Sequence, residues 1–302
     1  MNSSNDAVSV VIPCFNVAGV LQRQLDALVP QLRGDDEVLL VDNRSTDSTL
    51  ELIRTLTQNR PRIRGVEALE RRGANHARNV GVLAARHCRV LLCDADDEVL
   101  PGWVQAFRRA LDDKAVVGGA AIPVDAAGHQ VGEQRALMRI FDDRPYALSG
   151  CVAFRRDHFL RIGGFDESFA GGHDEADFGW RSAAAGVPVG QALDARILYV
   201  QRETPRLSYR QYRAYGRTAI QLWARHQDSM RPGSISFKGA LRSLGRKIPA
   251  GLKVALRRAD RSQAEAWGWA VGTVEGHLRY RFFGSPPDPI LLVQTVPDST
   301  PK

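Results

Sequence analysis

Three aspartates and a glutamate directly follow a short apolar segment in the first third of the chain. Residues 91–93 read Leu-Leu-Cys, which is typical of a buried strand, and residues 94–98 read Asp-Ala-Asp-Asp-Glu. Carboxylates this close repel one another unless a cation lies among them, and Mg²⁺ and Mn²⁺ prefer oxygen ligands of this kind. The segment therefore predicts either a divalent-metal site that holds an anion or an ordinary acidic turn with a helix cap.

A second group of carboxylates begins a helix in residues 171–181, which read Gly-Gly-His-Asp-Glu-Ala-Asp-Phe-Gly-Trp-Arg. The glycines precede the helix, so that Asp174 and Glu175 fall in its first turn. A carboxylate there can take a proton from an attacking hydroxyl, or it can simply stabilise the helix N-terminus. His173 is either a loop histidine at the edge of a cleft or a contact to acceptor or metal. Arg181 forms either a structural salt bridge or a phosphate contact.

Short apolar strands alternate with helical patterns over the first two thirds of the chain. The strands are expected at residues 8–12, 37–41, 62–66, 89–93 and 148–154, and helices at 21–32, 45–56 and 75–86. This alternation predicts an α/β fold with a mostly parallel sheet covered on both faces. Asp42 and Asp94 then lie at the carboxyl ends of strands, where open α/β sheets bind their ligands.

Local signals near these strand ends leave alternatives open. Asp42 either accepts a hydrogen bond from a nucleobase N–H or caps the helix that follows it. Ser45 or Thr46 is expected to cap that helix. Residues 97–98 are expected to face solvent or to cap a helix that begins near Pro101, a residue type favoured in first turns.

Composition and missing motifs exclude several classes of protein. The chain has 302 residues, is 44% hydrophobic and contains no run of the ~18 apolar residues that a membrane span needs. Residues 1–7 lack the features of a signal peptide, and four cysteines without paired spacing predict small buried side chains, so we expect a cytoplasmic protein. The strand at 8–12 is followed by neither a GxGxxG fingerprint nor a Walker P-loop, which argues against an NAD or ATP domain.

Five segments, taken in order, resemble the motifs of family 2 glycosyltransferases with the GT-A fold. They are residues 8–16, 41–47, 73–81, 94–97, and 163–167 followed by 174–181. The resemblance covers about residues 7–200. It implies an inverting transfer of a sugar from a nucleotide diphosphate donor, UDP-linked, to an acceptor hydroxyl, with Mg²⁺ or Mn²⁺ as cofactor. Because processive members carry a Gln-x-x-Arg-Trp motif and membrane spans that are missing here, transfer of a single sugar is favoured.

The resemblance also implies roles for single residues. It makes Asp96 the direct metal ligand, and it makes Asp94 the contact to ribose or to a metal-bound water. Glu175 becomes the base when the chain is aligned on residues 177–181, with Asp174 as the alternative, since the family often has Glu-Asp where this chain has Asp-Glu. The residues expected to bind the nucleotide sugar are Pro13, Phe15, Asn16, Asp42, Arg72, Arg78 and Asp94. Many relatives have a histidine near residues 199–201, but this chain has none.

The last third of the chain differs sharply in charge. Residues 1–201 hold 23 basic and 27 acidic residues, whereas residues 202–302 hold 18 basic and 7 acidic residues. We therefore expect a catalytic domain over 1–200 and a basic, mostly helical extension over 201–302. Within it, residues 238–261 form a basic amphipathic pattern interrupted at Pro249. This pattern either lies on anionic lipid at the inner face of the membrane or packs and dimerises; nucleic acid is disfavoured because no binding motif accompanies the charge.

Three further expectations concern function. Residues 123–145 form either a flap on the acceptor side or a plain surface insertion.

The transferase has two rival interpretations. One is a non-catalytic relative that binds nucleotide sugar or a protein partner. The other is a nucleotidylyltransferase, which would need a Gly-rich loop ending in lysine after the first strand. The acceptor could be a glycan, a lipid-linked glycan or a small molecule, and 36 arginines among 41 basic residues suggest a GC-rich bacterial source.

Overall fold

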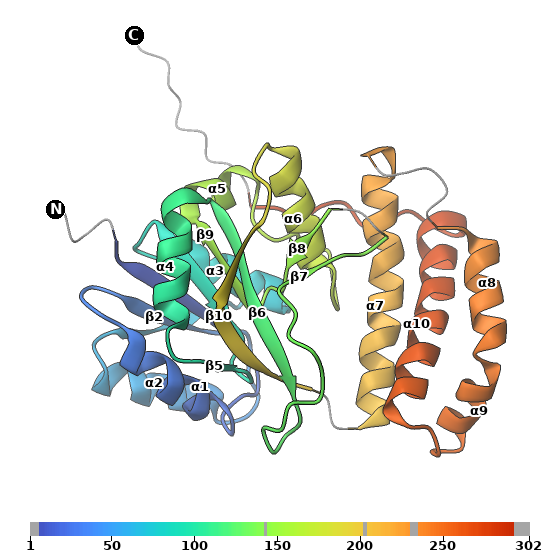
Figure 1. The fold of residues 1–302 in the computed structure, drawn as a ribbon, viewed down its shortest axis with the longest axis horizontal. Coiled ribbons are helices and arrows are strands. Elements are labelled where there is room, and N and C mark those ends of the chain that lie inside the picture. The colour runs from blue at the N-terminus through green and yellow to red at the C-terminus, as the bar shows by residue number, and fades with distance from the viewer. Residues whose placement is uncertain (1–5, 142–143, 202–203, 230–234, 293–302) are drawn as a thin grey trace, which may run out of the picture.

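An eight-stranded sheet forms the centre of the first two thirds of the chain, and a group of helices packs beside it (Figure 1). The computed structural model describes residues 6–141, 144–201, 204–229 and 235–292. The strand order is β3-β2-β1-β4-β9-β6-β10-β5. These strands are β1 (Val8–Cys14), β2 (Glu37–Asp42), β3 (Ile63–Glu67), β4 (Arg89–Cys93), β5 (Glu98–Val99), β6 (Val116–Val124), β9 (Cys151–Arg155) and β10 (Gly190–Val200).

Helices cover both faces of this sheet, as the alternating pattern predicts. One face carries α1 (Leu21–Leu28), which continues into the 3-10 helix η2 (Val29–Gln31), together with α2 (Thr49–Asn59) and α4 (Trp103–Asp113). The other face carries α3 (Ala74–Ala84), α5 (Arg156–Arg161) and α6 (Asp174–Ala184). In β1, Val10 joins the first core and Val11 the second, because successive strand side chains point to opposite faces. The predicted α/β fold with a mostly parallel sheet is confirmed.

Two strands run against the parallel direction. β9 pairs antiparallel with both β4 and β6, and β5 pairs antiparallel with β10. The strands β1, β2, β3 and β4 run parallel, as do β6 and β10. Because β4 and β6 both oppose β9, the carboxyl ends of all the parallel strands share one edge of the sheet. Strands β6 and most of β10 were not predicted, since their Gly-rich and mixed sequences give no clear apolar run.

Two local predictions differ from the structure at this edge. α2 begins at Thr49 with Ser48 as its N-cap residue, and neither Ser45 nor Thr46 caps it. The reason is tertiary, since the Ser45 hydroxyl accepts a hydrogen bond from the Asn16 N–H at 3.1 Å. α4 begins at Trp103, and a left-handed Gly102 separates it from the predicted start near Pro101.

The extension beyond residue 203 is helical, as expected. It consists of α7 (Pro205–His226), the 3-10 helix η3 (Gln227–Ser229), α8 (Phe237–Arg246), α9 (Ile248–Ala255), α10 (Arg261–His277) and the π-helix η4 (Leu278–Phe282). α7 and α10 lie backbone against backbone: a Cβ added at Gly268 would lie 2.5 Å from the Tyr209 carbonyl oxygen. The break between α8 and α9 falls at Lys247, because Pro249 occupies the first turn of α9. Within the described ranges, no helix has the length and apolarity to cross a membrane.

The expectations for the four cysteines and for the segment 123–145 agree with the structure only in part. Of the four cysteines, three are buried, but Cys88 is exposed. The segment 123–145 begins inside β6 and then forms part of a small second sheet, in which β7 (Leu137–Met138) pairs with β8 (Tyr146–Ala147). Residues 142–143 of that segment lie outside the described residues.

Candidate active site

The predicted site residues gather at the carboxyl edge of the parallel strands. Asp42 is the last residue of β2 and lies beside Cys14 at the end of β1. Asp94 follows β4, the next neighbour of β1 in the sheet. The strand pattern in the sequence therefore placed both carboxylates at the correct edge.

Asp42 has one oxygen that no protein group satisfies among the described residues. Its side chain is buried, Oδ2 accepts a hydrogen bond from the Ser45 N–H at 3.3 Å, and Oδ1 has no hydrogen-bond partner. Leaving a buried acceptor unpaired is unfavourable, so a ligand N–H is a suitable partner for it. The alternative, a cap for the next helix, is wrong because α2 begins only at Thr49 and its N-cap residue is Ser48.

The residues after β1 form one side of this edge. Pro13, expected in the turn, instead lies within β1 opposite Val41. Phe15 follows it with 57% of its surface exposed, and Asn16 adopts a left-handed conformation at φ 54°. The Asn16 side chain is already engaged, since its Oδ1 accepts a hydrogen bond from the Thr46 N–H at 2.7 Å. Phe15 is thus the exposed ring here, and Asn16 shapes the turn.

The acidic loop after β4 contains carboxylates in three different environments. Asp94 Oδ1 accepts a hydrogen bond from Arg78 Nη2 at 2.8 Å, while Asp96 is exposed. Gly150 lies against Asp94 so closely that a Cβ there would be 2.7 Å from Asp94 Oδ2. Asp97 was expected to face solvent or cap a helix, but it is buried and accepts from the Val200 N–H at 3.3 Å. Burial and the neighbouring negative charges raise the pKa of Asp97 well above its ordinary value.

The second carboxylate group lies at the N-terminus of α6, as predicted. His173 precedes the helix in a left-handed conformation, and both Asp174 and Glu175 belong to the first turn. Burial raises the pKa of the Glu175 carboxyl well above its ordinary value, and the adjacent charge of Asp174 raises it further. Burial also raises the pKa of Asp174, although Arg78 opposes the shift. A carboxylate of raised pKa in the first turn of α6 is a candidate general base.

His173 is not the predicted loop histidine at a cleft edge. It is buried, and its Nδ1 forms a hydrogen bond of 2.9 Å with Thr218 Oγ1 of α7. Burial lowers the pKa of His173 to about 4, so the ring is neutral at pH 7. It joins the catalytic part of the chain to the helical extension just before Glu175.

Arg78 connects the two acidic groups. Its guanidinium lies 2.8 Å from Asp94 Oδ1 and 3.5 Å from Asp174 Oδ2, and its side chain is 8% exposed. The guanidinium also lies over the Phe165 ring, 5.9 Å from the centroid. One buried cation thus holds the loop after β4 and the start of α6 together. Arg72, the other predicted arginine, is exposed at the turn before α3.

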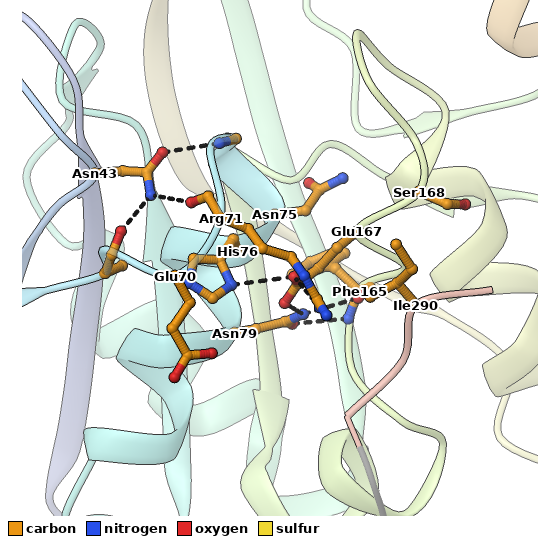
Figure 2. Close-up of polar contacts among 12 residues, drawn as sticks. Asn43, Glu70, Arg71, Asn75, His76, Asn79, Phe165, Glu167, Ser168 and Ile290 are labelled. Carbon is orange, nitrogen blue, oxygen red and sulfur yellow. Dashed lines mark hydrogen bonds and ion pairs between the residues drawn. The ribbon is translucent and has the colours of Figure 1, made fainter. Parts of the chain in front are cut away.

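Polar side chains of α3 fasten the loop at residues 163–169, as Figure 2 shows. Asn79 Nδ2 donates to the Phe165 carbonyl at 2.8 Å, and its Oδ1 accepts from the Phe165 N–H at 3.0 Å. His76 Nδ1 lies 3.0 Å from Glu167 Oε2, and Asn75 Nδ2 donates to the Phe169 carbonyl at 3.1 Å. The sequence motifs at residues 73–81 and 163–167 are therefore in contact, and these hydrogen bonds hold the loop in place.

The same figure shows how the turn before α3 is held. Asn43 Nδ2 donates to the carbonyls of Ala68 and Arg71 at 2.6 and 2.8 Å, and its Oδ1 accepts from the Gly73 N–H at 2.8 Å (Figure 2). The Asn43 side chain replaces the backbone partners that this irregular loop lacks. It fixes the path of the chain that leads to Arg72 and α3.

An Asn79→Ala variant is expected to lower the free energy of unfolding by about 3 kcal/mol, because it leaves buried polar groups of the 163–169 loop unpaired. Urea unfolding followed by circular dichroism measures this loss. Asn59→Ala is the matched control, since the exposed Asn59 only bonds to the Thr55 carbonyl of its own helix, and a change within about 0.5 kcal/mol is expected. Equal stability of the two variants would contradict the supporting role of Asn79.

Other residues at the site carry weak signals in the sequence or none. Arg181 forms a structural salt bridge, with its Nε 2.8 Å from Asp177 Oδ2, so the phosphate alternative is not supported. The other Asp177 oxygen lies 2.8 Å from His226 Nε2 at the end of α7. Tyr146 and Tyr215 approach the α6 carboxylates closely enough that, besides burial, negative charge from Glu175 raises the pKa of both phenols. Their positions depend on tertiary folding alone.

The acidic loop suits a cation that is coordinated partly by the protein and partly by a bound ligand, rather than a cation coordinated by protein groups alone. Within the described parts of the chain, no cluster of three or more His, Cys, Asp or Glu side chains is arranged to hold a metal ion. Mg²⁺ is typically bound by one or two carboxylates together with substrate phosphates and water. The exposed Asp96 and the partly exposed Asp94 supply oxygen ligands of that number and kind.

Sequence comparison places the chain among known transferases. The family model described as glycosyl transferase family 2 matches residues 9–165. Succinoglycan biosynthesis protein ExoO of Rhizobium meliloti is 32% identical over 161 residues, covering 50% of this chain and 44% of that protein. The uncharacterized glycosyltransferase YibD of Escherichia coli is 34% identical over 114 residues, covering 37% of this chain and 33% of that protein. The match thus spans less than half the length of each of these relatives.

Structural comparison supports the fold. The mannosyltransferase PcManGT from Pyrobaculum calidifontis, in complex with GDP-Man and Mn²⁺, has a TM-score of 0.56 at 21% identity, covering 88% of this chain and 86% of that one. S. aureus TarS 1-349 in complex with UDP-GlcNAc has a TM-score of 0.52 at 16% identity, covering 88% and 90%. The fold is therefore that of GT-A glycosyltransferases. Because the family match spans more than half of the 302 residues, the chain belongs to glycosyl transferase family 2.

Proposed function

We propose that residues 1–200 form a catalytic domain that moves a single sugar from a nucleotide diphosphate sugar to an acceptor hydroxyl, with inversion at the anomeric carbon. The residues beyond 200 then form the helical extension. One observation carries the proposal: the buried Arg78 pairs with Asp94 of the acidic loop and with Asp174, the neighbour of Glu175, and so holds the two acidic groups together. A donor held by the first group would present its anomeric carbon toward the second.

The donor nucleotide would lie across the ends of β1 and β2. The unpaired Oδ1 of Asp42 can accept the N–H of a base, and the exposed ring of Phe15 offers apolar contact beside it. Uracil carries such an N–H, and the complex of TarS with UDP-GlcNAc supports a UDP-linked donor. The complex of PcManGT with GDP-Man makes guanine the alternative base. Pro13 and Asn16 would shape the floor of this site, and Arg72 would face the ribose or phosphate.

Asp96, with Asp94 beside it, would hold Mg²⁺ or Mn²⁺ together with the diphosphate. When bound, such a cation neutralises the charge that develops on the leaving diphosphate. The Mn²⁺ in the PcManGT complex supports this assignment. Arg78 limits the repulsion between Asp94 and Asp174, so that both acidic groups can stay close to the donor.

Glu175 would take the proton of the acceptor hydroxyl as that oxygen attacks the anomeric carbon from the face opposite the diphosphate. The inverted product follows from a single displacement of this kind. Tyr146 and Tyr215, which lie near the α6 carboxylates, would line the acceptor side and exclude water from them. The acceptor is a hydroxyl compound small enough or flexible enough to reach this face.

An Asp96→Asn variant is expected to lose metal-dependent UDP binding while its fold stays intact, because the amide cannot supply the charged oxygen ligand. Isothermal titration of UDP with Mn²⁺ and with EDTA measures the effect. Asp157→Asn, which changes an exposed carboxylate of α5, is the control and should bind as the parent does. Parent-like UDP binding by Asp96→Asn under both conditions would remove Asp96 from the metal site.

A further inference from the structure

The helix α9 presents an apolar face that no described residue covers. Ile248, Leu252 and Leu256 recur every four residues, so they lie along one side of the helix. Their exposed fractions are 52%, 60% and 65%. A neighbouring side of the helix is packed, since a Cβ at Gly251 would lie 2.7 Å from the Trp267 ring of α10. Contiguous apolar surface of this kind on a folded protein marks an interaction site.

The stretch of chain that contains α8 and α9 is rich in cations. Residues 237–258 contain seven basic residues and no acidic one. Within the described residues, none of these seven side chains forms an ion pair with a carboxylate. They are Lys238, Arg242, Arg246, Lys247, Lys253, Arg257 and Arg258. A group of uncommitted cations beside exposed aliphatic side chains is complementary to a surface that is anionic outside and apolar within.

α9 lies at the same end of the molecule as the candidate active site. It lies at the end of the helical extension toward which β6 and β10 run, at the lower right of Figure 1. The carboxyl edge of the parallel sheet opens toward the same end of the molecule. A surface bound by α9 would therefore lie at the end of the molecule toward which these strands run.

We propose that α9 docks the protein on an anionic lipid bilayer, with Ile248, Leu252 and Leu256 inserted at the boundary of headgroups and acyl chains. A second copy of the chain fits the same face poorly, because two patches of seven cations would repel each other. The exposed apolar face consists of three side chains, whereas a stable protein interface has roughly 20–30 residues on each side. The docking is independent of the proposed sugar transfer.

Flotation of the full chain with vesicles tests the docking. The protein should float with vesicles of phosphatidylcholine and phosphatidylglycerol at low salt, and it should stay behind with phosphatidylcholine alone. Raising the salt should weaken binding, because the cations lie at the surface and are screened. A parent protein that does not float with the anionic vesicles at low salt would overturn the proposal.

Two sets of variants separate the apolar contribution from the charge. Leu252→Ser with Leu256→Ser should weaken vesicle binding about tenfold or more, whereas Leu83→Ser, which changes an exposed leucine of α3, should bind as the parent does. Replacing Lys253, Arg257 and Arg258 by glutamine should weaken binding roughly a hundredfold, since each basic residue near the surface contributes about fivefold.

A matched charge control is the replacement of Arg54, Arg86 and Arg109, three exposed arginines of the catalytic part, by glutamine. This control should retain vesicle binding, and UDP binding by calorimetry should stay unchanged in every variant that is folded. Parent-like flotation of the α9 variants would overturn the assignment. A fall in molecular mass by analytical ultracentrifugation in the α9 variants would instead assign the face to a second copy, and it would overturn the proposal as well.

Discussion

A Glu175→Gln variant is expected to keep nucleotide-sugar affinity and to lose transfer by about 10²–10⁴-fold, the usual contribution of a general base. Glutamine preserves the size of the side chain but cannot take a proton from the acceptor. Calorimetry with the donor and a coupled assay for released nucleotide diphosphate measure the two quantities separately. Full activity of Glu175→Gln would reject this residue as the base.

Asp174→Asn is the informative neighbour of that variant. It should lower the rate of transfer much less than Glu175→Gln does. If Asp174→Asn were inactive and Glu175→Gln active, the general base would be Asp174 instead. The pH profile gives a second readout, because a base must be deprotonated and the pKa of Glu175 is raised. kcat/KM should therefore fall as the pH drops through this raised pKa. Removing the charge of Asp174 should shift that fall to lower pH.

An Arg78→Met variant is expected to lower the free energy of unfolding by about 3–5 kcal/mol, because it leaves the buried carboxylate of Asp174 and the partly exposed carboxylate of Asp94 without their cation. Urea unfolding at neutral pH measures the loss. Arg78→Lys, which keeps the charge but not the forked geometry, should recover part of the stability.

The control for Arg78 is Arg54→Met, which removes an exposed ion pair with Glu67. Exposed pairs of this kind contribute about 0–1 kcal/mol, so this variant should stay close to the parent. If Arg78→Met were as stable as Arg54→Met, the two acidic groups would not depend on the buried cation. The claim that Arg78 holds them together would then be wrong.

The parts of the fold that the sequence predicts are those coded by local pattern. The apolar runs that became β1, β2 and β4 are buried on both faces, and such runs are readable because every position in them is constrained. The order of short motifs was equally informative, since each motif occupies a strand end or a helix start. Asp42 and Asp94 could therefore be placed at strand ends, and Glu175 in the first turn of a helix, from the sequence alone.

What the sequence could not predict depends on residues far apart in the chain. Asp97 is buried because β10 brings the Val200 N–H to it, and His173 is buried because α7 brings Thr218 to it. Ser45 fails to cap α2 because its hydroxyl accepts the N–H of Asn16 from another loop. In each case a polar residue that suits a turn or a cap was captured by a distant partner.

The motifs themselves divide into two kinds once their contacts are known. Asn79 and Glu167, which carry much of the resemblance to the family, bond to one another at 3.0 Å behind the site and hold its loop. Asp96 and Glu175 are instead the residues that we propose to bind the metal and to act as the base. A resemblance alone cannot distinguish these kinds, because residues that build a site and residues that react in it occur in the same motifs.

The most direct measurement is donor hydrolysis across a panel of UDP- and GDP-linked sugars, carried out with Mn²⁺, with Mg²⁺ and with EDTA, and accompanied by thermal shifts of the full chain. We expect one nucleotide, UDP, to raise the melting temperature with metal, and one UDP-sugar to be hydrolysed only when metal is present. Binding without any hydrolysis or transfer would favour the non-catalytic alternative. The account of a metal-assisted glycosyltransferase would be contradicted if no nucleotide sugar shifted the melting temperature and none were hydrolysed, with metal or with EDTA.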